Sequence, residues 1–337
     1  MIVAPHSTSS NQPLVTAWVG CYNHARFVIE ALESVRLQTY SHIQLIIWDD
    51  CSKDNSVELI RNWIQQHQIE CTFLPHTANL GLCKSLNEAI SLSQGKYCCV
   101  LAADDLWLPD RIARQVQLME NAADDVAMIY SDAIQINEQG QSLPKMFIEA
   151  NRPFSAPPEG FLFDVLFEGN FIPAMTTMIR RECFNHVGGY DEDLCFEDLD
   201  MWLRLSRRYK FIFDRTPGAK YRIVATSMIR AMSANMAQSY SKIWAKYIAG
   251  AGPEAQPEKI AVEAFTRMVW YSYMGGAPLP PRWRRGLLKH DCSLHTMVMI
   301  LCASCGISFA GFQKIFGFGL ALKQKLLGRP TLANSTG

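Results

Sequence analysis

Short apolar runs and longer amphipathic segments alternate along this chain up to about residue 130. The apolar runs predict β-strands at residues 14–19, 43–48, 71–74, 97–101 and 126–130. The segments between them have helical spacing and predict helices at 26–38, 57–66, 82–93 and 109–121. Strands and helices that alternate in this way form right-handed crossovers and a mostly parallel sheet with helices on its faces. The sequence therefore predicts an α/β fold with a Rossmann-like sheet.

Polar residues follow three of the predicted strands at the point where each strand ends. Gly20-Cys21-Tyr22-Asn23 follows the first, Asp49-Asp50 the second and Asp104-Asp105 the fourth. In open α/β sheets, ligands bind beyond the carboxyl ends of the strands. Adjacent carboxylates there attract a hard divalent cation, which can bridge to a diphosphate. For Asp104-Asp105 alone, a simple loop and helix start is the alternative.

Charge is unevenly divided along the chain, although the net charge is zero. From residue 225 onward there are 13 Lys and Arg against 4 Asp and Glu, and the first 224 residues hold 19 against 28. We expect a catalytic domain at residues 1–224 and a helical, basic, partly apolar extension at 225–337. The basic part suits an anionic membrane face or acceptor, and no nucleic-acid motif accompanies it, so no nucleic-acid partner is expected.

The cysteines, the first twelve residues and residues 292–320 indicate where in the cell the protein acts. Eleven cysteines without a regular framework suggest free thiols in a reducing compartment. The first twelve residues contain no apolar signal-peptide core, so we expect a cytoplasmic protein, with attachment to the inner membrane face as one alternative. Residues 292–320 leave three alternatives open: a helix packed on protein, an interfacial helix on an anionic leaflet, and a spanning helix.

An ordered set of short motifs identifies a resemblance. The set comprises Tyr22-Asn23, the run Ser-Val-Arg-Leu-Gln-Thr-Tyr at 34–40, Asp49-Asp50-Cys51-Ser52, Asn79-x-Gly81, Asp104-Asp105, Gly188-Gly189-Tyr190-Asp191 and Glu197-Asp198. It resembles family 2 glycosyltransferases with the GT-A fold, especially bacterial enzymes that build surface polysaccharides. Residues 104–130 are particularly similar to the spore-coat type, and the resemblance covers about residues 13–224.

The resemblance implies an inverting, metal-dependent glycosyltransferase. It would move a sugar from a nucleoside-diphosphate sugar, with UDP as the expected nucleotide, to a hydroxyl of a surface glycan or lipid-linked saccharide. Asp50 would accept a hydrogen bond from the nucleobase, and Tyr22 would wall the base. Asp104 and Asp105 would hold Mn²⁺ or Mg²⁺ and the ribose. The residues expected at the donor are Tyr22, Asn23, Asp50, Asn79, Gly81, Lys84 and Asp104.

The resemblance also assigns a base and leaves alternatives open. Asp198 would take the proton from the acceptor hydroxyl, with support from Glu197, and Asp191 is the second choice. Ala102 replaces the first Asp of the family's Asp-x-Asp, which leaves open whether Asp104 or Asp105 binds the metal directly. The Gln-x-x-Arg-Trp signature of the family's processive members is absent after residue 198, so we expect the transfer of one sugar per encounter. Transfer to a polyprenyl phosphate, and a nucleotide-binding scaffold with a weakened site, remain the alternatives.

Overall fold

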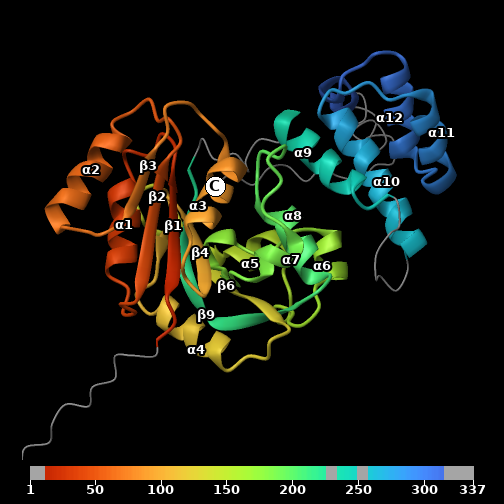
Figure 1. The fold of residues 1–337 in the computed structure, drawn as a ribbon. Helices are drawn as coiled ribbons and strands as arrows, with labels where there is room; N and C mark the ends of the chain where they lie inside the picture. The colour runs from red at the N-terminus through yellow and green to blue at the C-terminus, as the bar shows by residue number, and fades with distance from the viewer. Residues whose placement is uncertain (1–11, 225–233, 249–256, 315–337) are drawn as a thin grey trace, which may run out of the picture. The chain divides into compact units, whose positions relative to one another are not determined.

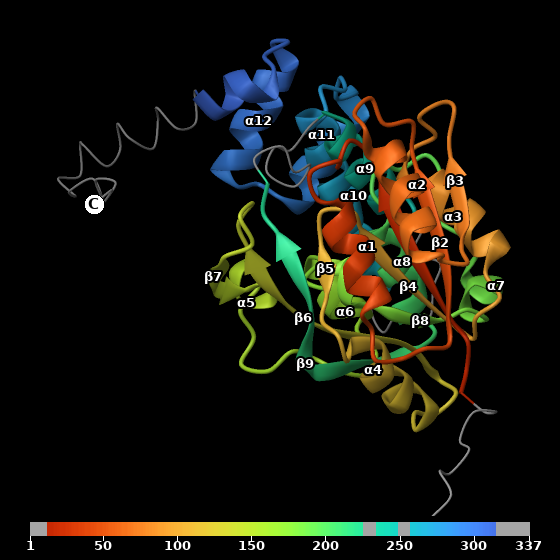
Figure 2. The same ribbon diagram turned by 90° about the vertical axis from the view of Figure 1, so that its left-hand side faces the viewer.

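The structure is a computed structural model that describes residues 12–224, 234–248 and 257–314. The chain divides into two compact units, Met1–Ser227 and Met228–Gly337. Figures 1 and 2 show a sheet with helices in the first unit and helices alone in the described part of the second. The domain boundary expected at residue 224 stays a prediction, because residues 225–233 lie outside the described part.

The first unit contains one nine-stranded sheet in the order β3-β2-β1-β4-β8-β6-β9-β5, with β7 paired to β6. Its strands are β1 (Val15–Cys21), β2 (Ile43–Asp49), β3 (Thr72–Pro75), β4 (Tyr97–Ala102), β5 (Leu106–Trp107), β6 (Val126–Ile136), β7 (Ser142–Met146), β8 (Met178–Arg180) and β9 (Lys210–Arg222). Strands β3, β2, β1 and β4 are parallel, as are β6 and β9. Pairings that involve β5, β7 or β8 are antiparallel. The predicted α/β fold is confirmed.

The helices of this unit include every helix predicted up to residue 121. They are α1 (Val28–Arg36), α2 (Ser56–His67), α3 (Leu82–Leu92), α4 (Arg111–Glu120), α5 (Phe147–Asn151), α6 (Phe163–Glu168), α7 (Cys183–Val187) and α8 (Asp198–Ser206), with a 3₁₀ turn at Ala174–Thr176.

Strand β1 shows how these helices cover the sheet. Val15, Ala17 and Val19 belong to the core that α1, α2 and α4 complete. On the other face, Trp18 donates to Ser93 Oγ at 2.9 Å and its ring lies 6.0 Å from Phe184. Helices therefore cover both faces, as expected for crossover connections.

The predictions after residue 130 were less accurate. The apolar run at 171–179 predicts one strand, but these residues hold the 3₁₀ turn and only the first part of the short β8. The four prolines at 137–160 predict a loop-rich segment, and in the structure this segment contains β7 and α5 between irregular parts. Strand β9 was not predicted, because its Pro217-Gly218 and charged residues hide the alternation that marks a half-buried strand.

The second unit is helical in its described residues. Its helices are α9 (Ala234–Ala245), α10 (Pro257–Met274), α11 (Pro281–His290) and α12 (Leu294–Ser304). The Tyr240 and Tyr271 rings stack 4.7 Å apart between α9 and α10. The sequence pattern predicts helices at 227–250 and 254–274, and parts of both ranges lie outside the described residues. Within the described residues, no helix is long and apolar enough to cross a membrane. Residues 315–320 of the expected tail helix lie outside the described part.

Candidate active site

The loops after β1 and β2 are joined by short polar contacts. Asp49, at the end of β2, accepts hydrogen bonds from the Ser52 N–H at 2.8 Å and the Ser52 hydroxyl at 2.6 Å. Ser52 Oγ in turn accepts the N–H of Asn23 at 2.8 Å, and Asn23 Oδ1 accepts the N–H of Lys53 at 2.7 Å. Asn23 has a φ of 56°, a left-handed conformation that Asn tolerates better than most residues. The side chain of Asn23, expected at the donor, thus fixes the two loops to each other.

The Asp50 carboxylate organises the next loop. Its two oxygens accept the N–H groups of Leu80 at 2.7 Å and Gly81 at 2.9 Å, just before α3 begins. A carboxylate at a helix N-terminus also interacts favourably with the helix dipole. On its other side, Oδ1 lies 3.1 Å from Nδ1 of His76, whose Nε2 lies 3.0 Å from Glu88 Oε2. Asp50 is buried and still has acceptor capacity on Oδ2.

The other residues expected at the donor surround Asp50. Asn79 Nδ2 donates to the Asp50 carbonyl at 3.1 Å, and the N–H of Asp50 donates to the Cys21 carbonyl at 2.9 Å, beside Tyr22. Tyr22 is 46% exposed, so its ring is available to a ligand. Lys84 is exposed on the first turn of α3, and no hydrogen bond ties it to this group in the described residues.

Asp104 and Asp105 point to different environments. Asp105 is buried, and its Oδ1 accepts the backbone N–H of Arg222 at 2.8 Å. Asp104 is half-buried, and no hydrogen bond or ion pair holds its carboxylate within the described part of the chain. The loop itself is joined to the end of β1, because the N–H of Ala103 donates to the Gly20 carbonyl at 2.9 Å. Burial, and then the charge of Asp104, raises the pKa of Asp105 well above its usual range, while the Arg222 N–H opposes that rise.

Arg222, at the end of β9, holds this loop in place. Its Nε donates to the Asp104 carbonyl at 2.9 Å, and its Nη1 donates to the Glu138 carbonyl at 3.1 Å. Its Nη2 pairs with Glu30 Oε2 at 2.7 Å, and the guanidinium lies 4.6 Å from the centre of the Phe27 ring. One buried arginine therefore connects the Asp104 loop, the β6–β7 turn and α1.

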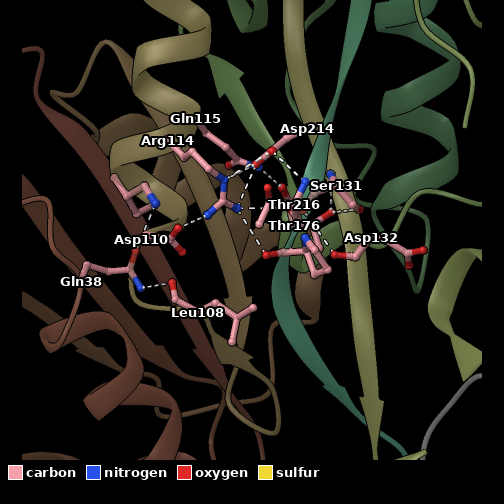
Figure 3. A network of polar contacts seen from close by, with 12 residues as sticks. Gln38, Leu108, Asp110, Arg114, Gln115, Ser131, Asp132, Thr176, Asp214 and Thr216 are labelled. Carbon is pink, nitrogen blue, oxygen red and sulfur yellow. Dashed lines mark hydrogen bonds and ion pairs between the residues drawn. The ribbon is translucent and has the colours of Figure 1, made fainter. Parts of the chain in front are cut away.

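A polar network fixes the chain that follows the acidic pair (Figure 3). The Arg114 guanidinium on α4 lies between Asp110 and Asp214, with Nη1 2.5 Å from Asp110 Oδ2 and Nε 3.0 Å from Asp214 Oδ2. Gln38 Nε2 donates to the Leu108 carbonyl at 2.8 Å. These contacts anchor the segment after Asp105 to α4 and to Gln38 just after α1, and they join α4 to β9.

The Glu197-Asp198 pair stands at the start of α8. Asp198 Oδ2 accepts Asn170 Nδ2 at 2.6 Å, and its Oδ1 accepts the N–H of Leu199 at 2.6 Å. Asn170 Oδ1 accepts the N–H of Ile172 at 3.1 Å, so the amide nitrogen is the atom that faces Asp198. Burial raises the pKa of Asp198 to about 6, and the bonds from Leu199 and Asn170 oppose the rise. Burial, followed by the charge of Asp198, raises the pKa of Glu197 to about 8.

Helix α3 connects this pair to the Asp50 region. Cys83 Sγ lies 3.7 Å from the Phe196 carbonyl, immediately before Glu197. One turn later, Asn87 accepts the Tyr190 N–H at 2.8 Å and donates to the Tyr190 carbonyl at 2.9 Å. Asp191, the second choice for the base, accepts the N–H of Asp193 at 3.0 Å in the same loop. The loop at 189–197 thus contacts the first two turns of α3, and Asp50 accepts the two N–H groups that directly precede them.

Sequence reasoning missed four residues that organise the site: His76, Asn87, Asn170 and Arg222. Each acts on a residue far away in the chain, and no motif marks such a partner in a single sequence. A fully buried arginine is rare unless it is paired, so burial of Arg222 would have marked it as a structural residue. That burial could not be inferred from the sequence, because β9, which carries Arg222, was not predicted.

The described residues contain no cluster of three or more His, Cys, Asp or Glu side chains that could hold a metal. Mg²⁺ and similar ions are commonly held by one or two carboxylates together with substrate phosphates and water. The Asp104 carboxylate, accessible and uncommitted, fits that mode of binding.

Comparisons with known proteins find relatives among the glycosyltransferases. The family model described as glycosyl transferase family 2 matches residues 16–188. The putative teichuronic acid biosynthesis glycosyltransferase TuaG of Bacillus subtilis is 26% identical over 238 residues, which are 70% of this chain and 88% of TuaG. An uncharacterized glycosyltransferase of Methanocaldococcus jannaschii is 30% identical over 220 residues, 63% of this chain and 72% of that protein.

Solved structures share the fold. S. aureus TarS 1–349 in complex with UDP-GlcNAc has a TM-score of 0.63 at 12% identity, over 94% of this chain and 93% of the 1–349 chain. The mannosyltransferase PcManGT from Pyrobaculum calidifontis, in complex with GDP-Man and Mn²⁺, has a TM-score of 0.58 at 18% identity, over 93% of this chain and 81% of its own. Both likenesses support the GT-A fold.

Proposed function

The chain belongs to glycosyl transferase family 2, and from this premise we propose that it is an inverting, metal-dependent glycosyltransferase that uses a UDP-sugar. Its acceptor is a hydroxyl of a surface glycan or of a lipid-linked saccharide, and it adds one sugar per encounter. TuaG, a relative named for teichuronic acid biosynthesis, supports the acceptor class. The UDP-GlcNAc complex of a structural neighbour supports the donor class.

The observation that carries the proposal is that the carboxylates of Asp50 and Asp104 are held differently, one by backbone N–H groups and the other only through its own backbone. Asp50 is fixed by Leu80 and Gly81, and keeps one acceptor position for an N–H of the nucleobase. Tyr22, exposed beside it, can wall the base. Asp104 is fixed through its backbone, while its carboxylate stays available to a cation.

We propose Asp104 as the direct metal ligand and Asp105 as the residue that positions the loop. The Asp105 carboxylate is committed to the N–H of Arg222 and is buried. When bound at Asp104, Mn²⁺ or Mg²⁺ would neutralise the charge that develops on the leaving diphosphate. Around it, the protein contributes a rigid backbone, through Arg222 and the Ala103–Gly20 hydrogen bond.

Asp198 is the proposed general base. It would take the proton of the acceptor hydroxyl while that oxygen attacks the anomeric carbon from the side opposite the diphosphate, which inverts the configuration. A pKa near 6 suits a base that must be ionised at neutral pH and still accept a proton in the transition state. Burial and the charge of Asp198 raise the pKa of the neighbouring Glu197 to about 8, so Glu197 is mostly protonated at neutral pH and Asp198 is the ionised member of the pair.

A transfer assay tests the function. It combines purified protein and Mn²⁺ with a panel of UDP-sugars and with candidate glycan and lipid-linked acceptors. We expect one UDP-sugar to give a product of inverted anomeric configuration by NMR. The Asp198→Asn variant should lose at least about 10²-fold in rate, the usual contribution of a general base. Full activity of Asp198→Asn with a polyprenyl phosphate acceptor would instead favour the polyprenyl-phosphate alternative. Tight nucleotide binding with no transfer from any donor would favour the scaffold.

A further inference from the structure

Helix α12 exposes an apolar face. Leu294, Met297 and Leu301 are 64%, 47% and 63% exposed and follow one another by three and four residues, so they share one side of the helix. The opposite side, with Thr296, Met299 and Cys302, is buried in the second unit. An ordinary surface helix shows polar residues to water, so this helix is apolar on the side that should be solvated.

These residues are concentrated in one part of the chain. Nine large hydrophobic side chains are exposed among the described residues, and four of them lie on α11 and α12. The fourth is Leu288, on α11. Exposed apolar residues are normal singly, but a group at helical spacing marks an interaction surface.

The neighbouring helix α11 carries a basic face. Arg282, Arg285 and Lys289 are exposed and again follow one another by three and four residues. From residue 264 to 314 the only acidic side chain is Asp291, which lies just before Ser293, the N-cap of α12, and accepts the Ser293 N–H at 2.9 Å and the Thr296 hydroxyl. Among the described residues, none of these three basic side chains forms an ion pair, so the basic face is available to an anionic partner.

A hydrogen bond joins the two helices. Arg284 on α11 donates through Nη1 to Ser304 Oγ at 2.6 Å. Ser304 lies three residues after Leu301, on the same side of α12, so a guanidinium stands at the edge of the apolar face. An apolar helix face bordered by basic side chains is the arrangement of an interfacial membrane helix.

We propose that the surface formed by α11 and α12 binds an anionic lipid bilayer. Leu294, Met297 and Leu301 enter the boundary between headgroups and acyl chains, while Arg282, Arg285 and Lys289 bind lipid phosphates. With eleven residues, α12 is too short to span a bilayer but long enough to lie along one. A symmetric dimer through this surface is less favourable, because it would bring two copies of the basic face together. This surface would hold the enzyme where a lipid-linked acceptor lies, but it does not depend on the donor or the base proposed above.

Co-sedimentation of the full chain with vesicles tests the proposal, without donor or acceptor present. We expect binding to vesicles of phosphatidylglycerol mixed with phosphatidylcholine, and little binding to phosphatidylcholine alone. High salt should weaken the binding, because screening reduces the lysine and arginine contribution. Failure of transfer activity would leave this result unaffected, so the two proposals can fail separately.

Paired variants locate the surface. Leu294→Gln with Leu301→Gln should weaken binding by about tenfold or more. The matched control, Leu37→Gln with Leu92→Gln, removes two exposed leucines from the first unit and should leave binding unchanged. Arg285→Gln with Lys289→Gln should weaken binding by roughly 25-fold, about fivefold per charge. Its control is Arg61→Gln with Lys145→Gln.

Three outcomes would overturn the proposal. One is the absence of wild-type binding to anionic vesicles. Another is binding that the α11 and α12 variants do not weaken. The third is a dimer in solution that Leu294→Gln with Leu301→Gln dissociates, without lipid binding, which would make this surface an interface between copies of the chain.

Discussion

The Asp105 carboxylate accepts a hydrogen bond of 2.8 Å from the backbone N–H of Arg222, and the Arg222 side chain donates to the carbonyl of Asp104 at 2.9 Å. One residue at the end of β9 thus holds both members of the acidic pair. The Asp104 carboxylate remains available to a ligand, whereas the Asp105 carboxylate accepts a hydrogen bond that holds the loop to β9. This asymmetry underlies the proposed roles of the two residues.

Arg222→Met tests the importance of this connection. The variant keeps the backbone N–H to Asp105 but removes the bonds to the Asp104 and Glu138 carbonyls and the pair with Glu30. We expect a loss of about 2–4 kcal/mol in the free energy of unfolding, because buried acceptors lose their partner. Chemical denaturation measures it, and the exposed Arg36→Met serves as control, with little change expected. An Arg222→Met protein as stable as the wild type would show that the side-chain contacts of Arg222 do not stabilise the fold.

Asn170→Ala should move the pH dependence of transfer. Asp198 must be ionised to act as a base, so the rate should fall as the pH drops through its pKa of about 6. Asn170 Nδ2 stabilises the ionised form, and its removal raises that pKa further. The acidic limb of the pH–rate profile should therefore move up by about one pH unit, the equivalent of one charge-assisted hydrogen bond.

The control for this prediction is Asn121→Ala, whose amide bonds only the Gln117 carbonyl of its own helix. It should leave the profile in place. A pH profile of Asn170→Ala that coincides with that of the wild type, at whatever absolute rate, would mean that Asn170 does not tune the base.

Asp198→Asn should reduce the pH dependence of stability while it lowers activity. A carboxyl whose pKa is raised on folding binds more protons in the native state, so its ionisation costs stability as the pH rises from about 4 to about 6. Relative to the wild type, the neutral amide should therefore gain about 1–2 kcal/mol between pH 4 and neutral pH, on top of a constant cost for the acceptor oxygen that it lacks. Melting curves of both proteins at neutral and acidic pH measure this. A difference in stability between the two proteins that stays the same at both pH values would contradict the cost assigned to the buried charge.

Asp50→Asn should weaken nucleotide binding. An amide has one acceptor oxygen, so it cannot accept from Leu80, Gly81 and a nucleobase as the carboxylate can. We expect the dissociation constant for UDP to rise about tenfold, in line with one lost hydrogen bond to a charged group. Calorimetric titration measures it, and Asp54→Asn, which alters a carboxylate on the neighbouring loop, is the control. Equal affinity of Asp50→Asn and wild type would remove Asp50 from the donor site.

The sequence predicted the first half of the molecule well because local patterns determine it. Strands such as β1 and β2 are continuous apolar runs, and the helices between them have clear spacing, so the ends of β1, β2 and β4 and the polar residues there could be found without a structure. Strand β9 carries Pro217 and Gly218 and pairs with β6, more than 70 positions earlier, so its formation depends on partners that no local pattern shows.

The same limit applies to the site. Asp50, Asp104 and Asp198 were identifiable because each lies in a short motif, although their roles stay predictions. The distinction between Asp104 and Asp105 depends on which carboxylate meets the N–H of Arg222, a contact across 117 positions. Asn170 reaches Asp198 from an irregular segment with no pattern of its own. Long-range polar contacts of this kind are specified by the folded backbone and not by neighbouring residues.

The most direct test of the proposed donor site is a thermal-shift titration with UDP, in the presence and absence of Mn²⁺, on the wild type, Asp104→Asn and Asp105→Asn. UDP with Mn²⁺ should raise the melting temperature of the wild type, since a ligand that binds only the native state stabilises it. Asp104→Asn should lose this effect, while Asp105→Asn, whose amide oxygen can still accept the Arg222 N–H, should keep it. A wild type that UDP, GDP, dTDP and CDP all fail to stabilise with Mn²⁺, or an Asp104→Asn protein that responds like the wild type, would contradict the account.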